Sequence, residues 1–417
     1  MKLVFSHPTA NANVRAVCSG LLNAGILDSF YTSIASFPGD SLDMLSKFPP
    51  FSELRRRRFD PALRALTHTW PWLEMGRLLS LKAGLKRFIR SERGIFSVDS
   101  VYKNLDNHVS ARLRAKAKGN ISAVYAYEDG AYASFAQAKK LGMKCIYELP
   151  IAYWETRKKL LAEEAERLPG WKQTLGGGIK DSPQKLEHKS MELELADLVI
   201  VPSEFVLNSL PEWSKEKIVH MAPFGSPAAT QIDKNMLPNQ HDKNRPLRLL
   251  FAGSMGQRKG LGDLFSAIHL LNDSNIELVI MGSLSAPIEF YRKILPRFIY
   301  EPGRPNEQVL ALMKTCDVFC LPSIIEGRAL VMQEAMSQGL PIIITPNTGG
   351  SDLVIEGETG FMVPIRSPEA IAQKLSWFLE NRSKIKEMGQ RAQQHAAKYT
   401  WDNYATSITT TIKTFLN

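Results

Sequence analysis

Cysteine is scarce in this chain of 417 residues, and no apolar run is long enough to span a bilayer. The four cysteines, Cys18, Cys145, Cys316 and Cys320, lack the paired spacing of a zinc site, which argues against a structural metal. They are expected to be small buried thiols in a reducing compartment. Met1 leads directly into an apolar strand without a signal peptide, so the sequence predicts a cytosolic protein.

A Gly-x-Gly-x-x-Gly fingerprint is also missing after the first strand of either half of the chain. Its absence argues against a dinucleotide-dependent oxidoreductase. Three consecutive glycines at 176–178 have no strand before them and no Lys-Ser or Lys-Thr after them. They therefore predict a turn and not a phosphate-binding loop.

What the chain does have is an ordinary globular composition, 44% hydrophobic and 23% charged, over a length that predicts two domains. Buried-strand runs alternate with helical segments in both halves, which predicts an α/β fold with parallel sheets. A polar, proline-bearing stretch at 226–246 has no periodicity and predicts a linker. It would join an N-terminal domain (1–225) to a C-terminal domain (247–400).

The most informative stretch reads as a strand at 318–322, a helix at about 327–338 and a second strand at 342–344. Glu326 lies at the carboxyl end of the first strand, and Glu334 follows two helical turns later. The unpaired N–H groups of the predicted first turn would point to the same crevice. The two carboxylates can accept hydrogen bonds from hydroxyls, and the N–H groups can bind an anion. Together they indicate a site for sugar rings and phosphates. The predicted amides belong to Gly327, Arg328, Ala329 and Leu330.

Pro322 through Ile343 resembles the Glu-x7-Glu signature of the retaining nucleotide-sugar glycosyltransferases with two Rossmann-like domains, the GT-B architecture of family 4. The resemblance implies two such domains facing across a cleft, with a last helix at about 401–417 that crosses back onto the first. It implies a UDP- or GDP-linked sugar as donor, retention of anomeric configuration, and no cofactor or metal. Glu326 and nearby amides would hold the sugar hydroxyls, and Glu334 the ribose.

The resemblance also implies a diphosphate site after the first strand of the C-terminal domain. Arg258 and Lys259 would stabilise the negative charge that accumulates on the departing nucleotide diphosphate. Gly282 would let the chain pass close to the nucleotide, and the loop at Gly303 and Arg304 would read the base. The remaining predicted donor residues are Gly253, Ser254 and Val331.

On the acceptor side, the resemblance is weaker over 1–225. Relatives place a histidine at the end of the strand predicted at 123–127, where this chain has Tyr127. Either Glu128 or Asp129 would act near the acceptor hydroxyl in its place, or the role is not needed; alternatively, Asp129 caps a helix at about 130–141. The other acceptor-side candidates are His7, Asn11, Asn13 (or a cap of the helix at about 13–24) and Glu148.

Positive charge is concentrated between residues 47 and 118, with 17 Lys and Arg against six Asp and Glu. A predicted helix at 73–90 carries leucines on one side and basic residues on the other. This block could lie on an anionic membrane at the inner face of the cell, or it could be a solvated helix packed on its own domain. Nucleic acid is not expected, because no recognition fold accompanies the charge.

These features together predict transfer of a sugar to a saccharide or lipid-linked acceptor, in the synthesis of cell-envelope polysaccharide or glycolipid. Two alternatives stay open. One is a non-catalytic scaffold that keeps the donor domain, which the missing cleft histidine favours. The other is a sugar-nucleotide epimerase, which the Glu-x7-Glu string argues against.

Overall fold

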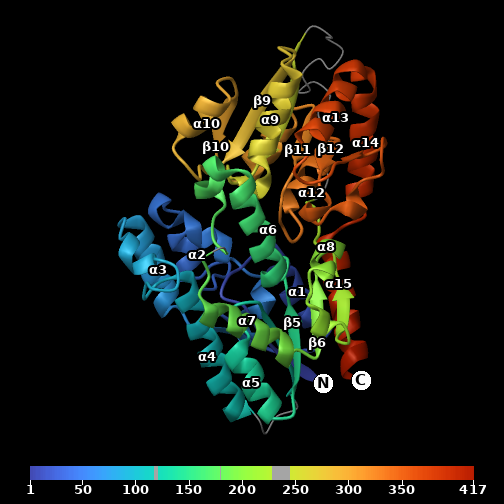
Figure 1. Cartoon of the computed structure of the whole chain (residues 1–417). Coiled ribbons are helices and arrows are strands. Elements are labelled where there is room, and N and C mark those ends of the chain that lie inside the picture. The colour runs from blue at the N-terminus through green and yellow to red at the C-terminus, as the bar shows by residue number, and fades with distance from the viewer. Residues whose placement is uncertain (117–120, 179, 228–244) are drawn as a thin grey trace.

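The computed structural model describes residues 1–116, 121–178, 180–227 and 245–417, and shows two α/β domains (Figure 1). Most of the predicted linker, and residues 117 and 118 of the basic block, lie outside the described residues. Each domain is built on a sheet in which all neighbouring strands are parallel. This confirms the predicted fold class.

The first sheet has the order β3-β2-β1-β4-β5-β6-β7, and the second has the order β10-β9-β8-β11-β12-β13. Most strands are short apolar runs covered on both faces, as parallel sheets require. The first sheet comprises β1 (Lys2–Ser6), β2 (Leu27–Thr32), β3 (Thr67–Thr69), β4 (Ile121–Tyr127), β5 (Lys144–Glu148), β6 (Leu198–Val201) and β7 (Ile218–Met221). The second comprises β8 (Leu247–Ala252), β9 (Ile276–Gly282), β10 (Ile299–Pro302), β11 (Val318–Leu321), β12 (Ile342–Ile344) and β13 (Gly360–Met362).

Helices cover both faces of each sheet (Figure 1). The N-terminal domain carries α1 (Ala12–Asn23), α2 (Ser41–Leu45), α3 (Trp72–Lys82), α4 (Val98–Lys116), α5 (Tyr132–Lys140), α6 (Trp154–Arg167), α7 (Pro183–Leu195), α8 (Glu204–Asn208) and the last helix α15 (Trp401–Leu416). The C-terminal domain carries α9 (Leu261–Leu271), α10 (Ile288–Ile294), α11 (Asn306–Met313), α12 (Leu330–Ser337), α13 (Pro368–Glu380) and α14 (Ile385–Ala396).

The last helix crosses back onto the N-terminal domain, as the family resemblance implies. Tyr404, Ile408 and Ile412 of α15 enter the same core as Val14 of α1. The two helices approach closely at Gly20, where an added Cβ would lie 2.9 Å from the Cβ of Ala405. Glycine is therefore required at this crossing.

A 3₁₀ helix after α6, η4 (Pro169–Thr174), packs against the other domain. Its Trp171 lies in the C-terminal core, with its ring 5.7 Å from that of Phe265. Thr174 accepts a hydrogen bond from the backbone of Gln257 at 3.0 Å. Residues before the predicted linker thus contribute to the C-terminal core, although the strands divide between the two sheets as predicted.

Three predicted elements have different bounds in the structure. The helix predicted at 73–90 ends at Lys82, because Gly84 has a φ of +68° and redirects the chain into the 3₁₀ helix η3 (Lys86–Ile89). The sequence at 30–34 also predicts a strand, and the structure has β2 there, which starts earlier because it pairs with β1 from Leu27. The helix expected to begin at Gly327 begins at Leu330. Within the described ranges, the helices are too short or too polar to cross a bilayer.

Candidate functional site

A cavity of about 630 Å³ lies between the domains and is lined by both. The C-terminal domain supplies most of its wall, including Glu326, Glu334 and Lys259. The N-terminal domain adds Pro150 and Phe224, which were not predicted from the sequence because neither belongs to a recognisable motif. The predicted residues that also line it are Asn11, Asn13, Gly253, Gly282, Gly303, Arg304, Arg328, Ala329, Leu330 and Val331.

Lys259 and Glu326 line this cavity, and Arg258, which is not among the lining residues, bonds to the same carboxylate. One oxygen of Glu326 accepts from Arg258 Nη1 at 2.8 Å and from Lys259 Nζ at 2.7 Å. Burial lowers the pKa of Lys259, and the charge of Glu326 opposes this shift. The 3₁₀ helix η6 (Gln257–Lys259) is held close to the end of β11, since a Cβ on Gly260 would lie 1.9 Å from the carbonyl oxygen of Pro322. The two predicted phosphate ligands are thus pre-positioned beside the predicted sugar ligand.

Gly253 and Gly282 both line the cavity, and position 282 needs glycine for a reason that the sequence did not reveal. The backbone of Gly282 has a φ of +153°, and an added Cβ would lie 1.7 Å from the carbonyl oxygen of Gly253. Glycine is therefore required at Gly282 by the neighbouring strand, whatever ligand the cavity takes. A Cβ on Gly253 would lie 3.4 Å from the Cε of Lys259. Ser254, which follows, is half-buried and does not line the cavity.

The start of α12 corrects the predicted set of free amides. Ala329 is the N-cap, and its N–H donates to the carbonyl oxygen of Thr348 at 3.1 Å. The helix starts late because contacts with the N-terminal domain hold the loop before it in place. Ser203 Oγ donates to the carbonyl oxygen of Gly327 at 2.6 Å, and a Cβ on Gly327 would lie 1.8 Å from the carbonyl oxygen of Pro150.

The side chain of Arg328 stabilises the loop before α12. It bonds to Asp352 at 2.6 Å and to Gln333 Oε1 at 2.8 Å, and its guanidinium lies 4.9 Å from the ring centre of Tyr399. The side chain is fully buried. It therefore orders the start of α12, while a ligand would meet the backbone at this position.

Glu334 lines the cavity beside the loop at Gly303 and Arg304. Its carboxylate accepts from Asn306 Nδ2 at 2.8 Å, and burial raises its pKa. Arg304 forms an ion pair with Glu301. Asn306 was missed from the sequence, because its contact with Glu334 joins two helices 28 residues apart.

On the acceptor side, Asn11 and Asn13 reach the cavity and His7 does not. Asn13 lies within α1, so it is not the helix cap; its Nδ2 donates to the hydroxyl of Tyr127 at 3.2 Å. His7 is buried beside the ring of Tyr127, with the ring centres 4.6 Å apart. Burial lowers the pKa of His7 to about 4, so the imidazole is neutral at pH 7.

Glu148 was predicted to face the cleft, but it lies in the protein interior. Its carboxyl accepts from the hydroxyl of Tyr404 in α15 at 2.8 Å, and from Tyr125. Tyr127 and Asn13 lie nearby and lower the pKa of Glu148. The strand end that should have exposed Glu148 is covered by α15. Burial raises the pKa of this carboxyl to about 6.

We expect this shift to make stability depend on pH. The folded state binds a proton at Glu148 more tightly than the unfolded state, whose ordinary value is 4.5. The free energy of unfolding should therefore fall by about 2 kcal/mol from this group as pH rises from about 4.5 to about 6. Urea titrations across this range should show that component missing in Glu148→Gln and retained in a Glu155→Gln control, whose side chain is exposed. Equal pH slopes in the wild type and Glu148→Gln would contradict it.

Glu128 and Asp129 were expected to face the cleft, and the structure places them elsewhere. Both bond to the ammonium of Lys189 on α7, at 2.9 and 2.7 Å, and Asp129 lines a separate cavity. Asp129 does not cap α5 either; it adopts a φ of +71°, and the buried carboxylate of Glu192 accepts from the N–H groups at that helix start. No local pattern in the sequence points to Lys189, because it comes from a distant helix.

The fold defined by these two domains is that of the GT-B glycosyltransferases. Sucrose-phosphate synthase from Thermosynechococcus elongatus superposes with a TM-score of 0.65 at 17% identity, covering 100% of this chain and 99% of that one. Anabaena HepE in complex with UDP superposes with a TM-score of 0.62 at 13% identity, covering 99% and 100%. Identities this low establish the architecture alone.

The sequence comparisons match only part of the chain. Residues 233–395 match the family model described as glycosyl transferases group 1. An uncharacterized glycosyltransferase of Methanocaldococcus jannaschii is 27% identical over 50% of this chain and 56% of its own length. The D-inositol 3-phosphate glycosyltransferase of Corynebacterium urealyticum is 34% identical over 38% and 41%. The chain thus spans about half the length of these relatives.

Proposed function

We propose that this protein is a retaining, metal-independent glycosyltransferase. It moves a sugar from a UDP- or GDP-linked donor to a hydroxyl of a saccharide or lipid-linked acceptor. The observation that carries the proposal is the meeting of Arg258 and Lys259 on Glu326 at the wall of a cavity lined by both domains. The structural neighbour HepE, which was solved in complex with UDP, supports a nucleotide donor.

Each group at the cavity has a role in this proposal. Arg258 and Lys259 hold the diphosphate and stabilise the charge that it gains as the bond to the sugar breaks. Glu326 and the amides before α12, other than that of Ala329, hold the sugar hydroxyls, and Glu334 holds the ribose. Glu326 is not assigned as a covalent nucleophile, because its carboxylate is neutralised by two cations. Closure of the domains would exclude water and limit hydrolysis of the donor.

The acceptor enters past Asn11 and Asn13, the predicted acceptor-side residues that line the cavity. His7 does not line the cavity, and burial makes its imidazole a weak base. Glu128 and Asp129 are paired with Lys189, so none of the three is assigned as general base. The acceptor proton then passes to the departing diphosphate oxygen.

The basic block supports a peripheral contact with anionic membrane, and so a role in envelope polysaccharide or glycolipid synthesis. Several large apolar side chains of this block are exposed next to its lysines and arginines, including Phe48, Trp72, Leu79, Leu85 and Phe88. An apolar, basic surface of this kind suits the interface of a bilayer.

A panel of UDP- and GDP-sugars tests the proposed activity by release of free nucleotide diphosphate. We expect release from one donor, undiminished by a metal chelator, and a loss of about 100-fold or more in Glu326→Ala. Glu358→Ala, at an exposed surface pair, is the matched control and should keep full activity. Nucleotide binding without consumption of any donor, with lipid-linked saccharides also supplied, would show a non-catalytic scaffold. Conversion of a donor into an isomer would show an epimerase.

A further inference from the structure

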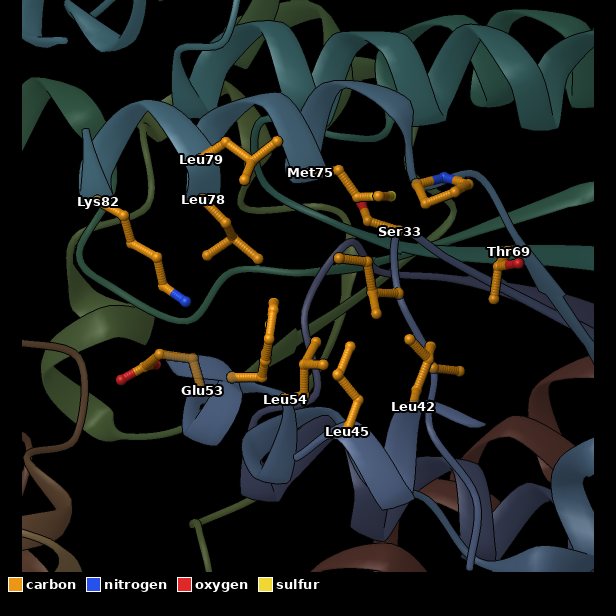
Figure 2. Close-up of a pocket in the computed structure, with 14 residues that line it drawn as sticks. Ser33, Leu42, Leu45, Glu53, Leu54, Thr69, Met75, Leu78, Leu79 and Lys82 are labelled. Carbon is orange, nitrogen blue, oxygen red and sulfur yellow. The ribbon is translucent and has the colours of Figure 1, made fainter. Parts of the chain in front are cut away.

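A second cavity, an apolar groove, leads away from the donor cavity on the N-terminal domain. It lies between α3 and the segment formed by α2 and the 3₁₀ helix η1 (Pro49–Arg57). Figure 2 shows Met75, Leu78 and Leu79 facing Leu42, Leu45 and Leu54 across it. The cavity volume is about 260 Å³. Two walls of leucine with an open rim can bind a flexible hydrocarbon.

The groove has a polar end on each side. Ser33 and Thr69 lie at one end, near the carboxyl edge of β2 and β3, and Glu53 and Lys82 lie at the other (Figure 2). The ammonium of Lys82 lies 4.9 Å from the ring centre of Phe51. Leu79 is 63% exposed at the rim, so the apolar surface is open to solvent.

A large basic basin connects the groove with the donor cavity. Glu53 and Leu78 belong to the walls of both groove and basin, while Asn11, Ala12 and Arg304 belong to both basin and donor cavity. The three cavities therefore lie in a row, each sharing wall residues with the next. A ligand lying along this row would have its apolar part in the groove and its far end at the donor sugar.

The basin is strongly cationic. Seven arginines and two glutamates line its volume of about 1180 Å³. Arg57 and Arg77 share the buried carboxylate of Glu74, which holds them in place. Arg56 and Arg58 are more than half exposed, and their contacts to acidic residues are long, at 3.6 and 3.5 Å. Both the arginines fixed by Glu74 and the exposed ones are suited to bind phosphate oxygens.

We propose that the groove binds the hydrocarbon chain of a phosphate-linked lipid acceptor, and that the basin binds its phosphate or diphosphate. The acceptor hydroxyl then lies beyond the phosphate, beside Asn11 at the donor cavity. This inference rests on the proposed transfer reaction and names the chemical class of its acceptor. The proposal is that the protein binds a single lipid chain, which differs from adhesion of the protein to a membrane surface.

Calorimetric titration of the full chain with decyl phosphate below its micelle concentration tests the proposal. Decyl phosphate should bind at least tenfold more tightly than either decanol or inorganic phosphate, because it satisfies groove and basin together. Each methylene added from octyl to decyl phosphate should strengthen binding by about three- to fourfold. This chain-length series uses the unmodified protein, so it does not depend on the folding of any variant.

Variants locate the two halves of the site. Leu79→Asp should weaken decyl phosphate at least tenfold and leave inorganic phosphate unchanged, whereas Leu270→Asp, at a similarly exposed leucine (57%) on α9, should change neither. Arg56→Gln combined with Arg58→Gln should weaken decyl phosphate about tenfold and leave decanol unchanged. Arg391→Gln, at an exposed surface pair, is the control for charge.

The outcomes separate this inference from the proposed activity. Donor turnover without any preference for decyl phosphate over inorganic phosphate would overturn the groove and leave the transferase intact. Binding to anionic vesicles but not to monomeric decyl phosphate would also overturn it, in favour of a membrane-adhesive surface. Decyl phosphate bound in the groove by a protein that turns over no donor would support the lipid site and reject the transferase.

Discussion

Replacing Lys259 with alanine is expected to lower the rate of sugar transfer by about 100- to 1000-fold. The side chain of Lys259 is 11% exposed and forms an ion pair with Glu326. The diphosphate gains negative charge as the sugar leaves, and a fixed cation in a site of low water content stabilises that charge more than water would. The loss should appear in kcat, because the extra charge exists only in the transition state.

Two further variants interpret this result. Lys259→Arg keeps the charge and should recover part of the rate, while Lys386→Ala removes an exposed lysine from α14 and should have no effect. Steady-state kinetics with the donor found in the panel would measure all three. A Lys259→Ala enzyme with kcat within threefold of the wild type would remove this residue from the proposed mechanism.

Replacing Glu164 with glutamine is expected to lower the free energy of unfolding by about 3 kcal/mol. Its fully buried carboxylate bonds to Arg167 and to Arg366 Nε at 2.8 Å, and it accepts from Gln257 Nε2 at 2.7 Å. Arg366 and Gln257 belong to the C-terminal domain, so this carboxylate joins the domains. The neutral amide would leave each partly buried guanidinium with one carboxylate fewer, since Arg167 would keep Asp263 and Arg366 would keep Glu163.

Glu163 provides the matched control for this experiment. It is adjacent in sequence and also bonds to Arg366, at 3.0 Å, but its side chain is 39% exposed. Glu163→Gln should cost less than about 1 kcal/mol, because water screens an exposed pair. Urea unfolding of both variants checks the difference, and equal losses would show that burial does not set the strength of this contact.

The local pattern of the sequence predicted both sheets, and the family resemblance implied that Arg258 and Lys259 lie with Glu326. Parallel strands follow from apolar runs that alternate with helices, and Glu326 and Lys259 lie at strand ends that must share one edge of a sheet. The family resemblance added the return of α15. Contacts of this kind are set by chain order, so a single sequence contains them.

The acceptor side was harder to predict because its side chains are positioned by distant partners. Glu148 is buried by Tyr404, which lies 256 residues away in sequence. Glu128 and Asp129 are turned from the cleft by Lys189 on another helix. The start of α12 is set by Ser203 across the domain interface. Periodicity and capping rules describe neighbours along the chain, and none of these contacts is between neighbours.

The hydrogen bond from Ser203 to the carbonyl oxygen of Gly327 couples the docking of the two domains to the order of the loop before α12. Gly327 directly follows Glu326, so a residue of the N-terminal domain helps to fix the position of this proposed sugar ligand. Separating the domains would release this loop and loosen Glu326, Arg258 and Lys259 together. In the proposed reaction, the donor would then be fully held only while the two domains are docked, which would limit hydrolysis of the activated sugar.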